Sequence, residues 1–148
     1  MDPKICQYLA DIGRRGGIRS RRALSEERAR AMVARREGRR AVRDLERTAA
    51  RIGLRDAPAF DLVHAGLRDL AEGRRTVESL LVSIGAPRLA LLGIRVPAAL
   101  PHPEEQLFDL LIEQYGDGAH ARYNALVRRL VSFARAVPLA QRAHARAG

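Results

Sequence analysis

The sequence predicts an all-α protein, in which a basic N-terminal helical arm is followed by a compact bundle of four to five short helices. Aromatic residues make up only 4% of the 148 residues and Trp is absent, so a core must be built from Leu, Ala, Val and Ile, which favours helix over sheet. Apolar residues recur at helical spacing in several segments. Residues 1–50 hold thirteen Arg and one Lys against seven acidic residues, which places +7 of the chain's net charge of +10 in the arm.

The arm is expected to span residues 1–54. Asp2 and Pro3 are a cap and first-turn pair, and the apolar spacing behind them predicts a short helix over residues 3–12. The sequence GRRGG then predicts a loop in which backbone amides and guanidinium groups approach one anion together, or alternatively a flexible joint. Ser25, with Glu26 and Glu27 behind it, predicts the start of a second helix that ends at Gly53.

The middle of this second helix, ARREGRRA over residues 34–41, offers no apolar anchor and is therefore predicted to lie outside the core. Glu37 is its only acid beside four arginines, and Gly38 would allow a bend. Two interpretations stay open, a solvated helix face or a helix that lies along phosphates or an acidic partner.

The bundle is expected over residues 57–137. Pro58 predicts the start of a helix that carries Phe60, Val63, Leu67 and Leu70 at helical spacing and ends at Gly73. Thr76 predicts the start of the next helix. The run from Gly85 to Pro87 then predicts a sharp turn into a short apolar segment, which has too few polar residues to be the recognition helix of a helix-turn-helix motif.

A proline-rich link over residues 95–103 precedes two more predicted helices. The first begins at Pro103 and ends at Tyr115. The second runs over residues 119–136 and ends before Pro138, which leaves residues 138–148 as a loose tail. Its apolar positions form one arc with arginines on both margins, and a phosphate role for those arginines is secondary to covering the core. These arginines are Arg122 and Arg129 on one margin and Arg128 and Arg135 on the other.

No constellation of catalytic chemistry is apparent, so neither a catalytic residue nor a cofactor or metal ligand is predicted. Zinc-ligand spacing, a phosphate-binding loop and a nucleophile elbow are absent from the sequence. Asp109, Glu113 and His120 would serve a small nuclease, but an exposed acidic helix face explains them better. His64 is interpreted as a hydrogen-bonded packing residue.

Arg95 and His102 have the spacing of an Arg and His pair found in helical ribonuclease domains of toxin systems. Those domains hold both residues at one helix start, whereas Pro97 and Pro101 lie between them here, so the pair is not assigned a role.

The compartment follows from what the chain lacks. Cys6 is the only cysteine, which fits a reducing cytosol, and no apolar run is long enough to span a bilayer. A cytoplasmic protein with no membrane partner is therefore expected.

The opening of the chain resembles that of uncharacterised small bacterial proteins whose genes are associated with toxin–antitoxin or defence loci. The pattern is GRRGG, SRR, MV and RE followed by RR, and the matching positions are Gly13 to Gly17, Ser20 to Arg22, Met32, Val33, Arg36, Glu37, Arg39 and Arg40. Residues 81–94 and 119–133 likewise look like segments of small bacterial proteins without an assigned activity. The resemblance implies a regulatory, antitoxin-like binding role and transfers no catalytic residue.

The expected function is non-enzymatic binding of nucleic acid, with DNA and RNA both left open, through phosphate contacts made by the arm. The predicted contacts are Arg14, Arg15, Arg19, Arg21, Arg22, Arg35, Arg36, Arg39 and Arg40. The alternative is a protein-interaction subunit whose basic arm docks on an acidic protein partner, such as a toxin or another enzyme that it inhibits, while Leu-rich bundle faces form a homo-oligomer.

Overall fold

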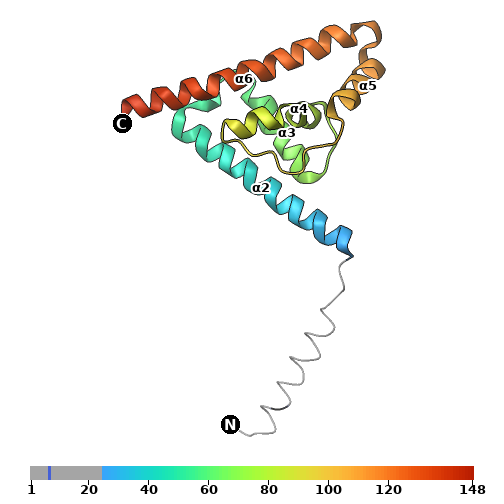
Figure 1. Cartoon of the computed structure of the whole chain (residues 1–148), viewed down its shortest axis with the longest axis horizontal. Coiled ribbons are helices and arrows are strands. Elements are labelled where there is room, and N and C mark those ends of the chain that lie inside the picture. Colours follow the sequence, from blue (N-terminus) through green and yellow to red (C-terminus); the bar gives the residue numbers. More distant parts are fainter. Residues whose placement is uncertain (1–6, 8–24) are drawn as a thin grey trace. The chain divides into compact units, whose positions relative to one another are not determined.

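The computed structural model describes residue 7 and residues 25–148 (Figure 1). Every regular element in residues 25–148 is helical, so the predicted all-α bundle is confirmed. The elements in order are α2 (Glu26–Ile52), the 3₁₀ turn η1 (Leu54–Asp56), α3 (Phe60–Glu72), α4 (Val77–Leu91), α5 (Pro103–Tyr115), the 3₁₀ turn η2 (Gly116–Gly118) and α6 (Ala119–Ala147). Apart from Gln7, the helix expected over residues 3–12 lies outside the described residues, as does the glycine-rich loop.

The chain divides into two compact units, Met1–Ala31 and Met32–Gly148, and α2 begins in the first and continues in the second. The arm expected over residues 1–54 and the bundle expected over residues 57–137 stay predictions. The C-terminal part of α2 contributes to the core, since Leu45, Ala49 and Ile52 are buried in the same apolar cluster as residues of the later helices.

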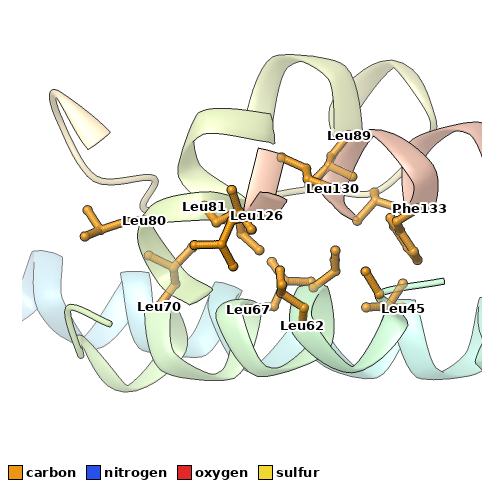
Figure 2. Close-up of a cluster of buried hydrophobic side chains, with 14 of the residues drawn as sticks. Leu45, Leu62, Leu67, Leu70, Leu80, Leu81, Leu89, Leu126, Leu130 and Phe133 are labelled. Carbon is orange, nitrogen blue, oxygen red and sulfur yellow. The ribbon is translucent and has the colours of Figure 1, made fainter. Parts of the chain in front are cut away.

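The core of the second unit is built almost entirely from aliphatic side chains, as the composition predicts (Figure 2). Phe133 of α6 is its one fully buried aromatic residue. Leucines from α2, α3, α4 and α6 belong to the same cluster, and α5 adds Leu107 and Leu111. The leucines labelled in Figure 2 are Leu45, Leu62, Leu67, Leu70, Leu80, Leu81, Leu89, Leu126 and Leu130.

Local chemistry sets the end of α3 and the start of α4 where the sequence predicts them. Gly73 ends α3 with φ 72°, a backbone conformation that residues other than glycine rarely adopt. Thr76 then caps α4, because its hydroxyl accepts a hydrogen bond from the backbone N–H of Ser79 at 3.1 Å, and the backbone N–H of Thr76 donates to the Ser79 hydroxyl at 2.8 Å. The same Thr76 hydroxyl donates to Asp69 at 2.6 Å and so ties the start of α4 to α3.

The predicted turn from Gly85 to Pro87 is wrong, because α4 continues through these residues to Leu91. Val82 and Leu89, on either side of the expected break, are both fully buried. A Cβ added at Gly85 would lie 2.8 Å from the Leu130 side chain, so this glycine allows α6 to approach α4 closely. Packing along the whole helix therefore outweighs the backbone hydrogen bond that Pro87 removes.

The predicted end of the last helix before Pro138 is also wrong, and residues 138–147 form helix instead of a loose tail. Val137 is buried in the core, and Ala140, beyond the proline, packs against it. Apolar contacts thus continue past Pro138 for one helical turn, and α6 continues with them to Ala147.

The prediction that residues 34–41 lie outside the core is wrong at two positions. Gly38 and Ala41 are buried. A Cβ at Gly38 would lie 2.6 Å from the Ala71 Cα and 2.7 Å from its Cβ, so the glycine lets the backbones of α2 and α3 come together. Gly38 therefore permits a close helix contact, because it has no Cβ to collide with Ala71.

Candidate nucleic-acid interface

Four of the nine predicted phosphate contacts lie on α2, and all four are exposed. They are Arg35, Arg36, Arg39 and Arg40. Among residues 25–148, no carboxylate oxygen lies within 4.0 Å of the guanidinium nitrogens of Arg35, Arg36 or Arg39. The other five predicted contacts, Arg14, Arg15, Arg19, Arg21 and Arg22, lie outside the described residues.

Arg40 is the exception on α2. Its Nε lies 3.9 Å from Oδ2 of Asp44, whose other carboxylate oxygen lies 3.8 Å from Arg47. One carboxylate is thus shared by two arginines across long distances, and the side chains of Arg40 and Arg47 are 68% and 78% exposed. Exposed pairs of this kind contribute about 0–1 kcal/mol, so Asp44 neutralises Arg40 only in part.

A cavity of about 390 Å³ lies where α2 meets α3, and three arginines line it. Arg39 and Arg43 come from α2, and Arg68 comes from α3. The contact between Gly38 and Ala71 lies beside this cavity, since Ala71 is itself one of the lining residues. Close packing of the two helix backbones therefore brings Arg68 to the arginines of α2.

The two acidic residues of the cavity already have partners. Oε1 of Glu46 lies 2.8 Å from Nε2 of His64, and Oε2 of Glu72 lies 2.7 Å from Arg74. No described carboxylate lies within 4.0 Å of the guanidinium nitrogens of Arg39, Arg43 or Arg68. The cavity thus presents three guanidinium groups that form no ion pair within 4.0 Å in the described part of the chain, although Glu46 and Glu72 line the same cavity.

His64 has the structural surroundings of a packing residue, as the sequence predicted. Besides its contact with Glu46, its ring stacks on Phe60 with 5.8 Å between the ring centroids.

Arg74 is held in a second polar cluster at the end of α3. Its hydrogen bond with Asp69 is the main cause of a raised Arg74 pKa, and the charge of Glu72 adds to the effect. Glu72 is therefore paired with Arg74, and no ion pair within 4.0 Å joins it to the three cavity arginines.

A second concavity, of about 340 Å³, lies along α2 and shares two of its lining residues with the first. Arg35 and Arg36 line it together with Arg39 and Arg43, which line both. We call these arginines and Arg68 the α2 track. The part on α2 extends over about 12 Å, since residues 35 and 43 are eight helical steps apart. Met32, 59% exposed, lies at its N-terminal end.

Sequence reasoning found part of this track and missed two members. Arg43 follows Arg39 by four residues and shares its helix face, so helical spacing alone could have identified it. Arg68 lies on another helix, and only the close approach at Gly38 indicates its place. The track contains neither Asn nor Gln, so it has no residue that pairs with adenine, although arginine can pair with guanine.

The residues of the nuclease alternative do not form a metal site among the described residues. No group of three or more His, Cys, Asp or Glu side chains is placed there to hold one metal ion. Asp109 and Glu113 are exposed on α5, and Nδ1 of His120 lies 3.0 Å from the Asn124 amide on α6.

The two residues of the unassigned Arg and His pair lie in different settings. Arg95 borders a small cavity beside α2, whereas His102 directly precedes the first turn of α5.

Comparison with protein-family models, with curated proteins and with solved structures gave no match. Within residue 7 and residues 25–148, no helix combines the length and the apolar character needed to cross a membrane.

Proposed function

We propose that the protein binds nucleic acid through the α2 track, whose arginines contact backbone phosphates. The observation that supports this most directly is the meeting of Arg39, Arg43 and Arg68 at one cavity, where the two neighbouring carboxylates are already engaged. Arginine presents a planar fork of donors that matches phosphate oxygens. Arg14, Arg15, Arg19, Arg21 and Arg22 stay predicted phosphate contacts outside the described residues, and a regulatory, antitoxin-like role stays a prediction from the sequence.

Substitution, not truncation, is the way to test the track, because Leu45, Ala49 and Ile52 of α2 belong to the core. Removing residues 1–54 would take away part of the bundle with the arginines. In the full chain, Arg39, Arg43 and Arg68 are changed together to Gln. A matched control changes Arg55, Arg88 and Arg95 to Gln, since these are exposed, lie off the track and remove the same charge.

The measurement is affinity for a duplex DNA and a duplex RNA over a range of salt concentrations. Log affinity falls linearly as log salt rises. Each phosphate contact that a substitution removes makes this line shallower by about 0.9 for duplex DNA, so the line for the track variant should be shallower than that of the wild type by about 2.7. The control variant should keep the slope of the wild type within about 0.5. Equal slopes for the two variants would contradict the assignment of the track.

The same measurement separates the alternative function. An acidic protein partner would be favoured if the wild type bound neither nucleic acid at low salt but bound a polyglutamate chain. The exposed Met32 and Val33 would then be expected to add an apolar contact, and changing both to Ser would weaken that complex. For a phosphate-binding track, the same change leaves the salt slope unaltered.

A further inference from the structure

α6 carries a second concentration of positive charge that the α2 track does not use. Six arginines and no acidic residue lie between Ala119 and Ala147. Two of the arginines have partners in the bundle: Arg129 lies 3.5 Å from Asp61, and Arg122 lies over the Tyr115 ring at 5.5 Å from its centroid. The other four are Arg128, Arg135, Arg142 and Arg146, and in the part of the chain that the structure describes no carboxylate oxygen lies within 4.0 Å of their guanidinium nitrogens.

These four arginines form one line along the helix, which we call the α6 stripe. Their spacings of seven, seven and four residues place them on one face. The buried residues Leu126, Leu130 and Val137 lie on the opposite face, so the stripe points away from the core. From Arg128 to Arg146 it extends over about 27 Å, which corresponds to about eight base pairs of a duplex at about 3.4 Å each.

The stripe and the α2 track are separate surfaces of the same unit. α2 contributes Leu45 to the core and α6 contributes Phe133, and the two side chains come from different helix ribbons (Figure 2). None of the four stripe arginines lines either concavity of the track. The two surfaces therefore share no arginine.

The chemistry of the stripe favours duplex DNA over single-stranded nucleic acid and duplex RNA. Its exposed apolar neighbours, Val131 and Leu139, are aliphatic, so the stripe lacks the aromatic side chains on which single-stranded bases stack. Residues 141–147 are helical and exposed on all sides. An α-helix with its side chains is about 10–12 Å across and enters the major groove of B-DNA, whereas the major groove of an RNA duplex is too narrow.

We propose that the α6 stripe is a second binding surface for duplex DNA, so that one molecule holds two DNA segments. The first segment occupies the α2 track, and the inference rests on the proposed function of that track. The second lies along α6, with the stripe arginines on its phosphates and the exposed helix end in or beside the major groove. The molecule is then a DNA-bridging protein in addition to a DNA-binding one.

A capture assay with the full chain tests bridging. One duplex is fixed to beads, the protein is added, and retention of a second, labelled duplex is measured over a range of salt concentrations. The stripe variant changes Arg128, Arg135 and Arg142 to Gln. The control is again the triple change of Arg55, Arg88 and Arg95, and thermal melting by circular dichroism checks that every variant is folded.

The wild type and the control should retain the second duplex, whereas the stripe variant should still bind one duplex and retain less of the second at each salt concentration. The slope of log retention against log salt should fall by about 2.7 for the stripe variant, because three of its arginines no longer contact phosphates. Sedimentation should give the same mass for all variants. Retention by the stripe variant equal to that of the control would overturn the inference and leave the proposed function standing.

Two further outcomes also count against it. If the stripe variant lost retention and its mass in solution fell, α6 would be a contact between protein copies and not a DNA surface. Equal retention of a labelled RNA duplex would overturn the choice of DNA. Failure of the wild type to bind either duplex DNA or duplex RNA would instead overturn the proposed function, which distinguishes the two ideas.

Discussion

The effect of replacing Gly38 by Ala on stability is expected to have one sign if the helix is exposed at this position and the opposite sign if α2 packs there against α3. In an exposed helix, Gly to Ala stabilises by about 1 kcal/mol. In the structure the new Cβ would lie 2.6 Å from the Ala71 Cα, a distance at which α2 must move away from α3. Because the atom it meets belongs to the backbone, a change of rotamer cannot relieve the overlap.

The magnitude follows from the difference between the two effects. Overpacking in a well-packed core costs about 1–3 kcal/mol, from which the helix propensity gain of about 1 kcal/mol is subtracted. We therefore expect a net destabilisation of up to about 2 kcal/mol. For a chain of this size each kcal/mol lowers Tm by roughly 4 °C, so a fall of up to roughly 8 °C is expected.

Thermal unfolding followed by circular dichroism measures the effect, with Gly118→Ala as the control. A Cβ at Gly118 has one neighbour, the Tyr115 Cβ at 3.8 Å, and the φ of −78° suits any residue. This change should stay within about 0.5 kcal/mol of the wild type. A higher Tm for Gly38→Ala would refute the close helix contact and, with it, the placement of Arg68 beside Arg39 and Arg43.

Three other changes test separate features of the fold. Thr76→Ala removes the cap of α4 and the 2.6 Å hydrogen bond to Asp69, and should cost about 1–2 kcal/mol in urea unfolding. Pro138→Ala restores a backbone N–H inside α6 and should raise Tm, whereas a loose tail would give no change. Burial, followed by the charge of Glu104, raises the pKa of Tyr123 above 10.0. The folded chain therefore holds this proton more tightly than the unfolded chain, so its contribution to stability is complete below about pH 10 and is lost as pH rises further. Base titrations of stability for the wild type and Tyr123→Phe should diverge there.

The helix ends that can be predicted from the sequence are those set by residues nearby in the chain. Gly73 ends α3 because of its own backbone conformation, and Thr76 caps α4 through a residue three positions away. The same local rules failed at Pro87 and Pro138. At both prolines, core contacts on each side of the expected break hold the helix together, and those contacts come from segments distant in sequence.

The candidate site shows the same limit. Exposed arginines on one helix can be recognised from spacing, and Arg35, Arg36 and Arg39 were. Arg68 was not, because its place in the cavity depends on a contact between Gly38 and Ala71, which lie 33 positions apart in the chain. From the sequence, Gly38 is interpreted as allowing a bend, because the sequence shows that Gly38 lacks a side chain but does not show that Ala71 lies in the space where that side chain would be.

The distribution of charge, more than its total, supports a directional interaction with DNA. A net charge of +10 alone would attract polyanions to the whole surface. The chain instead concentrates charge by helix: residues 103–118 hold five acidic residues and no basic one, whereas α6 holds six arginines and no acidic one. Glu105, Asp109 and Glu113 are exposed on α5, so they repel a phosphate backbone from that side. Under the proposed function, this distribution would steer DNA segments to the α2 track and the α6 stripe and away from the acidic helix. If Asp109 and Glu113 were changed to Asn and Gln, this repulsion would weaken, and DNA association should become faster and less dependent on the two basic surfaces.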